Sequence, residues 1–337
     1  MHLQKNTSLK PFNTFGVDVK AKEFCQVGSV EELAEVLRFY KDQEVFILGG
    51  GSNMLLRSDL DRPVIHINIK GVEVLEQKDK SVIVRAMAGE NWHEFVLWCL
   101  QNNFGGLENL SLIPGNVGAA PIQNIGAYGV EMKDHFVSCE VMDLKDQTIK
   151  TFFKKDCDFG YRESVFKNRL KGKVAITSVS FRLSTQDHRI KTTYGAIEQE
   201  LSTMGVEHPG IKEVSDAVIA IRSSKLPDPS KIGNSGSFFK NPVISQEHYR
   251  KLKEQFPEMP GYNMPDGQMK VPAGWLIEMA GFKGKRFGDY GVHTKQALVL
   301  VNYGGATGSE IYTLAQLIKK TVSRIFEIDI EMEVNII

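Results

Sequence analysis

The sequence of 337 residues lacks several features that would assign it to a common class of protein. Its 41 lysines and arginines balance 41 aspartates and glutamates, so no overall charge draws it to nucleic acid or to an anionic membrane. It has no run of the roughly 18 apolar residues that a membrane-spanning helix needs, and its first residues contain no apolar core of a signal peptide. We therefore expect a cytoplasmic protein with neither a nucleic-acid partner nor a membrane partner.

Metal-binding and disulfide patterns are also missing. The four cysteines, Cys25, Cys99, Cys139 and Cys157, are far apart and form no CxxC pair. The eight histidines form no HxH or HExxH motif and no cluster with cysteine. We expect four reduced thiols, mostly in packing roles, and no metal ion.

The usual phosphate-binding motifs are absent, although glycine is plentiful. The chain has neither GxxxxGK[ST] nor GxGxxG, which argues against a P-loop and against a Rossmann dinucleotide site. Instead, a short apolar run that is typical of a buried strand leads into "GGGSN" at 49–53. Glycine lets the backbone take positive φ and approach a phosphate closely. A plain turn at the end of a strand explains this pentapeptide equally well.

A second glycine-rich segment, "PGNVGAAPIQNIGAYG" at 114–129, lies inside an irregular region from 104 to 132. Long loops in compact domains are usually functional or disordered, and this one is too apolar for disorder. It offers many backbone N–H donors and few charges, which suits a pyrophosphate and a flat ring. The two segments together predict a long cofactor, and FAD fits better than a mononucleotide.

Hydrophobic periodicity predicts a mixed α and β chain of two or three domains. Ser29 followed by Glu32 has the spacing of a capping box, and a helical pattern follows to Tyr40. A proline-marked linker near Arg222–Asp228 is the expected domain boundary. Further helices are expected at 91–103, 213–222, 247–256, 274–281 and 309–326, and strands at 62–71, 80–90, 136–144, 148–153, 173–183, 297–302 and 328–337.

Seven motifs occur along the chain in this order: "NTFGV", "GGGSNML", "IPGNVGAAPIQNIGAYG", "YRESVFK", "KLPDP", "GSFFKNP" and "EMEV". Together they resemble the family of UDP-N-acetylenolpyruvoylglucosamine reductases. The resemblance runs from about residue 10 to the C-terminus. It implies a FAD-binding fold of the vanillyl-alcohol-oxidase (PCMH) type in two subdomains, plus a smaller α+β substrate-binding domain. The expected boundaries are 1–70 with about 332–337, then 71–222, and 223–331 for the substrate domain.

The resemblance also implies an activity. NADPH would give a hydride to FAD, and the reduced flavin would reduce UDP-N-acetyl-3-O-(1-carboxyvinyl)-glucosamine to UDP-N-acetylmuramate, a peptidoglycan precursor. Because 104–132 contains neither histidine nor cysteine, we expect the FAD to be non-covalent. Family members are generally monomers. Two alternatives stay open: another FAD-dependent oxidase or dehydrogenase of this fold, and a non-catalytic sensor of flavin or nucleotide sugar.

Three residues match the family's catalytic positions. Arg162 matches the clamp on the substrate carboxylate, where charge grows during the reaction. Ser237 matches the proton donor, with Ser235 as its rival, and Glu331 matches a late glutamate that hydrogen-bonds the carboxylate, with Glu333 as its competitor. The structural alternatives are a surface salt bridge for the arginine and a turn residue for the serine.

Other matches concern binding. Lys225 and Asn241 match residues that hold the diphosphate, and Tyr194 matches a tyrosine on a loop that closes over it in the longer, type I enzymes. Tyr303 stands where type I enzymes carry an acidic residue. Tyr161 is a further expected substrate contact. The expected FAD contacts are Gly49, Gly50, Gly51, Ser52, Asn53, Pro114, Gly115, Asn116, Gly118, Ile122, Gln123, Asn124, Gly126, Ala127, Tyr128, Gly129 and Arg182, the last with a plain strand-edge arginine as its alternative.

Overall fold

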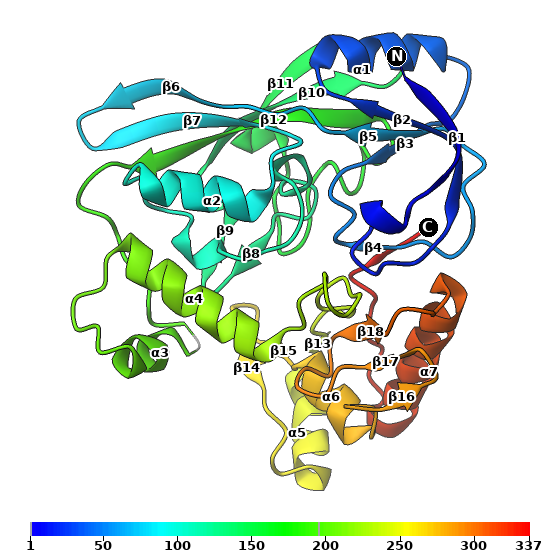
Figure 1. Cartoon of the computed structure of the whole chain (residues 1–337). Coiled ribbons are helices and arrows are strands. Elements are labelled where there is room, and N and C mark those ends of the chain that lie inside the picture. Colours follow the sequence, from blue (N-terminus) through cyan, green and yellow to red (C-terminus); the bar gives the residue numbers. More distant parts are fainter. Residues whose placement is uncertain (1, 195) are drawn as a thin grey trace. The chain divides into compact units, whose positions relative to one another are not determined.

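The computed structural model describes residues 2–194 and 196–337. The chain divides into two compact units, each assembled from separate stretches of sequence (Figure 1). Unit 1 comprises Met1–Thr7, Ala21–Gly50 and Leu60–Ser224, and unit 2 comprises Ser8–Lys20, Gly51–Asp59 and Lys225–Ile337. The glycine segment at 49–53 is therefore shared between the two units.

The first sheet of unit 1 has the order β1 (Leu3–Ser8), β2 (Lys20–Val27), β5 (Val64–Ile67), β3 (Phe46–Leu48). Strands β2 and β3 both run parallel to β5. Helix α1 (Val30–Phe39) is capped by Ser29, whose side chain accepts a hydrogen bond from the Glu32 N–H. The Glu32 carboxylate accepts from the Gly28 N–H, one residue before the position that a capping box predicts. The buried face of α1 packs against apolar side chains of β2 and β5, in a core that also includes Met142 of β10 (Phe136–Asp143) and Ala175 of β12 (Val174–Ser184).

The second sheet of unit 1 is antiparallel, with the order β11 (Ile149–Phe153), β10 (Phe136–Asp143), β12 (Val174–Ser184), β7 (Ser81–Met87), β6 (Val72–Lys78). Alternate side chains of β7 are buried, as expected of a strand with one face toward a core. Helix α2 (Trp92–Gln101) packs on that face, where the Phe181 ring lies 5.8 Å from Trp92 and 5.4 Å from Phe95 between ring centroids.

Two helices complete unit 1. Helices α3 (Ile197–Thr203) and α4 (Ile211–Lys225) share a small apolar core, against which Tyr128 and Ile190 also pack. Short 3-10 turns of unit 1 lie at Glu108–Leu110, Val117–Ala119, Met132–Asp134 and Lys154–Asp156, and another lies at Lys10–Phe12 in unit 2.

Unit 2 is built from short strands and three helices. Its strands are β4 (Met54–Leu55), β13 (Val243–Ile244), β14 (Tyr262–Asn263), β15 (Met269–Lys270), β16 (Arg286–Phe287), β17 (Tyr290–Val292), β18 (Leu300–Asn302) and β19 (Asn335–Ile336). Its helices are α5 (Gln246–Gln255), α6 (Ala273–Met279) and α7 (Gly308–Phe326). The fully buried rings of Phe15, Phe238 and Phe239 form an aromatic centre for this unit.

The last strand differs from its prediction. The sequence predicts one strand over 328–337, whereas only β19 is a regular strand, and it pairs in parallel with β4. In the residues before it, the structure shows one isolated bridge, between Phe239 and Met332. Neither β4 nor β19 exceeds two residues, so the C-terminus is held by local pairs rather than by a long ladder.

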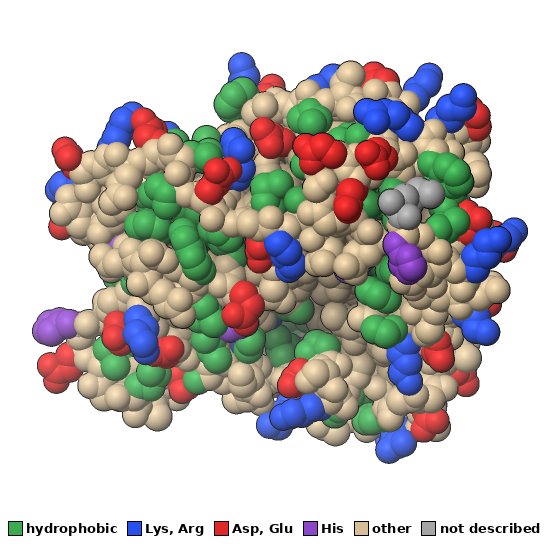
Figure 2. Space-filling model, turned by 45° about the horizontal axis from the view of Figure 1, so that its top comes forward, with side chains coloured by type: hydrophobic (Ala, Val, Ile, Leu, Met, Phe, Trp, Pro, Cys, Tyr) green, Lys and Arg blue, Asp and Glu red, His purple; other side chains and the backbone are tan. Residues whose placement is uncertain are grey.

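The surface charge, the helices and the cysteines can be compared with the sequence-based expectations. On the face shown in Figure 2, basic and acidic side chains are interspersed, with no large field of one sign. No helix in the described part of the chain is long and apolar enough to cross a membrane. The four cysteines are buried and free, and the described residues contain no group of three potential metal ligands.

Candidate active site

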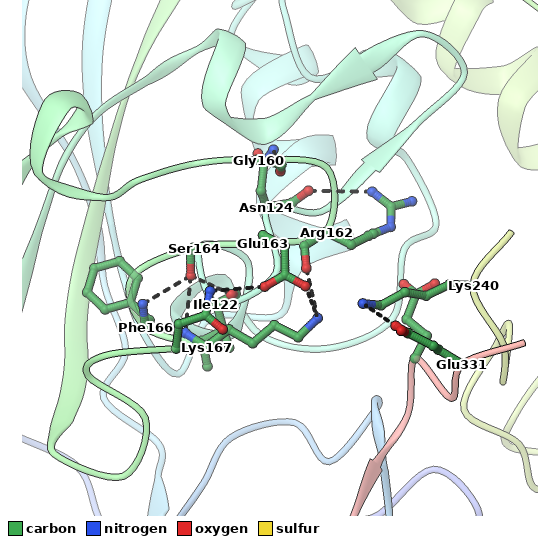
Figure 3. Close-up of polar contacts among 12 residues, drawn as sticks. Ile122, Asn124, Gly160, Arg162, Glu163, Ser164, Phe166, Lys167, Lys240 and Glu331 are labelled. Atoms are coloured by element: carbon green, nitrogen blue, oxygen red, sulfur yellow. Dashed lines mark hydrogen bonds and ion pairs between the residues drawn. The ribbon is translucent and has the colours of Figure 1, made fainter. Parts of the chain in front are cut away.

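In unit 1, two segments that are far apart in sequence are joined by polar side chains (Figure 3). The buried Ser164 hydroxyl donates to the Ile122 carbonyl at 2.5 Å. The fully buried Asn124 amide donates to the Gly160 carbonyl at 3.0 Å, and its oxygen accepts from the Lys133 N–H at 3.1 Å. These contacts fix the turn that carries Arg162 against the loop predicted to hold FAD.

Arg162 occupies a strained position on this turn. Its φ is +58°, which non-glycine residues rarely adopt and which is often found at functional sites. Its Nη2 donates to the Gly126 carbonyl at 2.6 Å, and Lys167 Nζ donates to the Arg162 carbonyl at 2.8 Å. The guanidinium also lies 5.4 Å from the centroid of the Tyr161 ring. The side chain is thus held by the same loop that carries the predicted cofactor residues.

The motif "IGAYG" forms a tight hairpin. Strands β8 (Gly126–Ala127) and β9 (Val130–Glu131) are joined by Tyr128 and Gly129, whose φ values are +48° and +79°. Two central residues with positive φ are typical of the type I′ turn of two-residue hairpins. Burial raises the pKa of the Tyr128 phenol, which keeps it neutral, and the Arg222 guanidinium is its charged neighbour.

The segment Pro114–Gly118 is seated against the end of β7. The Gly118 N–H donates to the Ala88 carbonyl at 3.0 Å, and a side chain at this position would bring its Cβ within 2.5 Å of the Ala88 Cβ. A side chain at Gly50 would likewise collide with Asn116 Oδ1, at 2.7 Å. The two glycine segments predicted to bind FAD therefore touch each other in unit 1.

The geometry of these segments fits an anionic cofactor. The backbone N–H groups of Gly115 and Asn116 have no acceptor among the residues that the structure describes, and both residues are partly exposed. Donors of this kind, presented by a loop at the end of a strand, suit a pyrophosphate. In unit 2, Gly51 has φ +59° and packs on the Phe12 carbonyl, while the Asn53 carbonyl accepts from the Asn335 N–H at 3.1 Å.

In unit 2, burial separates the two candidate serines. Ser235 is buried, and its hydroxyl hydrogen-bonds the Met54 carbonyl at 3.2 Å. Ser237 is exposed, and its hydroxyl has no partner in the described part of the chain, although its backbone bridges to Val299. Phe238 and Phe239 are both buried in the core, so they anchor Ser237 rather than line the space around it.

The two candidate glutamates lie in one irregular strand that pairs with the residues after Ser237. The Lys240 N–H donates to the Glu331 carbonyl at 2.9 Å, and the Glu333 N–H donates to the Phe238 carbonyl at 2.8 Å. The Glu331 side chain is 73% exposed, and its carboxylate lies 3.4 Å from Lys240 Nζ (Figure 3). Glu333 is only partly exposed.

The other predicted substrate residues are spread over both units. Asn241 uses its side-chain oxygen to accept from the Ala273 N–H at the start of α6, at 2.9 Å, which leaves its NH₂ group for a ligand. Lys225 ends α4 and is exposed, as is Tyr161. Tyr194 is 58% exposed and lies against Gly129, where an added Cβ would meet the Tyr194 Cβ at 3.2 Å.

Arg182, a predicted FAD contact, lies in β12 near the end of that strand. Phe181 and Leu183, its neighbours in β12, point into the core shared with the cofactor loop. Successive side chains of a strand point to opposite faces, so the Arg182 side chain is on the other face, where it is exposed and near Glu76. The strand itself is the central one of the sheet, paired with β10 and with β7.

Known proteins resemble this chain along its whole length. A family model described as "UDP-N-acetylenolpyruvoylglucosamine reductase, C-terminal domain" matches residues 228–337, and one described as "FAD binding domain" matches residues 21–152. The UDP-N-acetylenolpyruvoylglucosamine reductase of Flavobacterium johnsoniae is 57% identical over 337 residues, covering 100% of each chain. This chain belongs to the UDP-N-acetylenolpyruvoylglucosamine reductase family.

Further relatives agree with that assignment. The UDP-N-acetylenolpyruvoylglucosamine reductase of Chromobacterium violaceum is 47% identical over 337 residues, covering 99% of this chain and 98% of its own. The crystal structure of the reductase from Thermus caldophilus superposes with a TM-score of 0.69 at 23% identity, covering 100% of this chain and 99% of that one. The predicted family, the α+β FAD-binding fold and the cofactors FAD and NADPH are confirmed, and the chain is an oxidoreductase.

Several residues that shape this site are not among the predicted site residues. Ser164 and Lys167 lie inside the quoted motif "YRESVFK", so their roles were open to prediction. Asn109 and Arg222 lie in no quoted motif. Their importance depends on burial against Tyr128, which local sequence does not reveal.

Proposed function

We propose that this chain catalyses the NADPH-dependent reduction of the enolpyruvyl ether of UDP-N-acetylglucosamine to UDP-N-acetylmuramate, a step of peptidoglycan precursor synthesis. The observation that carries the proposal is the full-length identity of 57% to a relative named for this activity. The exposed, unpartnered hydroxyl of Ser237 supports it, because the reaction needs a proton donor.

FAD would be held by unit 1, through Gly49, Gly50, the donors at Gly115 and Asn116, and the hairpin that contains Tyr128. The remaining predicted contacts in 122–129, and Gly51 to Asn53 in unit 2, stay part of this proposal, whereas the placement of Arg182 does not favour it. When bound, FAD supplies a two-electron carrier that takes a hydride from NADPH and passes it to the substrate. The loop 104–132 contains no histidine or cysteine, which supports non-covalent binding.

Arg162 would bind the substrate carboxylate. Hydride addition to the methylene carbon places negative charge on the neighbouring carbon and into the carboxylate. A guanidinium that is always charged and already held by the Gly126 carbonyl needs little reorganisation to stabilise that charge. Tyr161, next to it, would shield the same end of the substrate.

Ser237 would donate the proton that quenches the carbanion-like centre. A serine hydroxyl is a weak acid, but an enolate-like carbon is a strong enough base to take its proton. The transient alkoxide needs a nearby cation, and Lys240, three residues on, is the candidate in unit 2. Ser235 is a poor candidate, because its hydroxyl is buried and bonded to the Met54 carbonyl.

A glutamate would hydrogen-bond the same carboxylate as a neutral acid. The sequence match favours Glu331, but the side chain of Glu331 is largely exposed beside Lys240. Burial is what keeps a carboxyl group protonated near neutral pH. The partly buried Glu333, paired with Phe238, therefore competes strongly for this role.

The nucleotide end would be held by polar groups that the fold leaves available. The NH₂ group of Asn241 and the ammonium of Lys225 have no partner among the described residues, and both are donors suited to a diphosphate. Tyr194, on the segment after Ile190, would close over it. We further propose a cytoplasmic monomer, with FAD subdomains at 1–70 plus 332–337 and at 71–222, and a substrate domain at 223–331.

An anaerobic half-reaction tests this function. The purified protein is reduced with one equivalent of NADPH, and the enolpyruvyl nucleotide sugar is then added while flavin absorbance is followed. Prompt reoxidation with formation of UDP-N-acetylmuramate is the expected result. Flavin that stays reduced until oxygen enters would point to an oxidase of the same fold, and flavin that NADPH does not reduce would point to a sensor.

A further inference from the structure

The segment that carries Tyr194 rests on the cofactor hairpin of unit 1. Tyr194 lies against Gly129, the second residue of the hairpin turn. Ile190, at the start of the segment, packs against the same small core of α3 and α4 as Tyr128. The hairpin turn at Tyr128 and Gly129, which is proposed to contact FAD, therefore also supports Tyr194, which is proposed to close over the substrate.

One buried side chain joins the two. Asn109 is 1% exposed, and its Nδ2 donates both to the Tyr128 carbonyl at 3.1 Å and to the Lys191 carbonyl at 2.9 Å. Its Oδ1 is buried and has no partner among the described residues. The opposite orientation of the amide would place that oxygen against two carbonyls, so the donor must face them.

The unpaired oxygen shows that this amide is placed for its donors. A buried polar atom without a partner lowers stability, and a small apolar residue would avoid that cost. The two hydrogen bonds that Asn109 donates offset this cost, because they link the hairpin at Tyr128 to the segment at Lys191, which no regular strand connects. The hairpin turn is itself strained at Tyr128, with φ +48°, so its conformation needs such outside support.

We propose that Asn109 is a positioning residue that fixes the Tyr194 segment on the cofactor hairpin, so that the loop over the nucleotide sugar is in place only when the hairpin is. This proposal rests on the proposed function for the role of Tyr194. Asn109 touches neither substrate nor cofactor in it, and acts through the carbonyls of Tyr128 and Lys191.

The test compares wild type with Asn109→Ala and Asn109→Asp in the FAD-loaded protein. The second variant keeps the size of the side chain and removes both donors. Asn302→Ala is the matched control, because Asn302 is also buried and donates to a main-chain carbonyl, that of Phe15, within unit 2. Amide hydrogen exchange of peptides covering 189–194 and 126–131 is measured, together with kcat and KM.

We expect exchange over 189–194 to become about tenfold faster in both Asn109 variants and to stay unchanged in the control. KM for the nucleotide sugar should rise about tenfold while kcat changes less than threefold and the flavin content stays that of wild type. Unchanged exchange over 189–194 in both variants overturns the proposal. Loss of FAD with that exchange unchanged also overturns it, by placing Asn109 in the cofactor pocket alone. The exchange result holds even if this substrate is not turned over, so the two proposals can fail separately.

Discussion

At the scale of single residues, burial decides between side chains that the sequence treats alike. Ser235 and Ser237 lie two positions apart in one motif, yet one hydroxyl is bonded in the interior and the other is exposed. Ser237→Ala should slow substrate-driven reoxidation of the flavin by about 10²–10⁴-fold while reduction by NADPH changes less than twofold. Stopped-flow absorbance measures both steps.

Ser235→Ala is the matched comparison. Its loss leaves the Met54 carbonyl without that donor, so we expect a loss of about 1–2 kcal/mol in the free energy of unfolding and near-normal reoxidation. If Ser235→Ala, rather than Ser237→Ala, abolished reoxidation, the assignment of the proton donor would be reversed.

The two glutamates allow a second test of the same kind. We expect Glu333→Gln to lower kcat by at least 100-fold and Glu331→Gln to lower it by less than tenfold, because Glu331 is 73% exposed and faces Lys240. Steady-state oxidation of NADPH measures both variants. The reverse ranking would restore Glu331, as the sequence match has it.

The motif residues at this scale could be predicted, but their surroundings could not. The sequence identifies Arg162 through the motif "YRES", while its bond to the Gly126 carbonyl depends on contacts 36 residues apart. Arg182 shows the limit: its position after an apolar run predicts a strand correctly, but not which face of the sheet meets the cofactor loop.

At the scale of elements, the glycine loop needs a close approach to β7. An added Cβ at Gly118 would lie 2.5 Å from the Ala88 Cβ and 3.0 Å from its Cα, so backbone must move. Gly118→Ala should lift the loop and weaken FAD binding at least tenfold, measured by flavin fluorescence during titration of the apoprotein. Gly172→Ala is the control: it has φ +69° and nothing within 4 Å, so it should cost about 1 kcal/mol of stability and leave FAD affinity unchanged. Equal affinities for the two variants would contradict the close-packing argument.

Periodicity predicts elements well where one face is buried along a whole element, as in α1, α2, α7 and β7. It fails for the C-terminal strand. The residues 328–334 alternate in the manner of a strand, but the described contacts show one isolated bridge to 237–240, between Met332 and Phe239, with a backbone hydrogen bond on either side. Such pairing depends on neighbours distant in sequence, which no local pattern encodes.

At the scale of the whole molecule, unit 2 takes Ser8–Lys20 and Gly51–Asp59 from the middle of unit 1's sequence. The proline-marked linker indicates a boundary close to Lys225, from which the rest of the chain belongs to unit 2. No sequence pattern indicates that the two short earlier segments also belong to unit 2. They are fixed by pairs such as β4 with β19 and by the bond from the Asn234 N–H to the Thr14 carbonyl at 2.9 Å.

The pH dependence of stability also belongs to the whole chain, because partly buried histidines lie in both units. Burial lowers the pKa of His66, His93, His135 and His293 below the ordinary value. In the unfolded chain these groups titrate near about 6.5, so between that pH and the lower folded values the unfolded state binds more protons. Their contribution is fully present above about pH 6.5 and is lost as the pH falls through the folded values.

Carboxylates act in a separate, more acidic window. Hydrogen bonds from Thr148, Ser230 and Thr307 lower the pKa of Asp146, Asp228 and Glu310, so their contribution is lost only below about pH 4.5.

We therefore expect the urea midpoint of the FAD-saturated protein to fall as the pH is lowered from 7.5 to 5.5, before the carboxylates titrate. His93→Gln should reduce that fall, because His93 Nδ1 accepts from the Leu112 N–H at 3.0 Å and protonation ends this bond, whereas a glutamine oxygen can accept it at any pH. A midpoint that stays level over this range, or a variant whose midpoint falls as far as that of wild type, would show that the partly buried histidines do not govern acid stability.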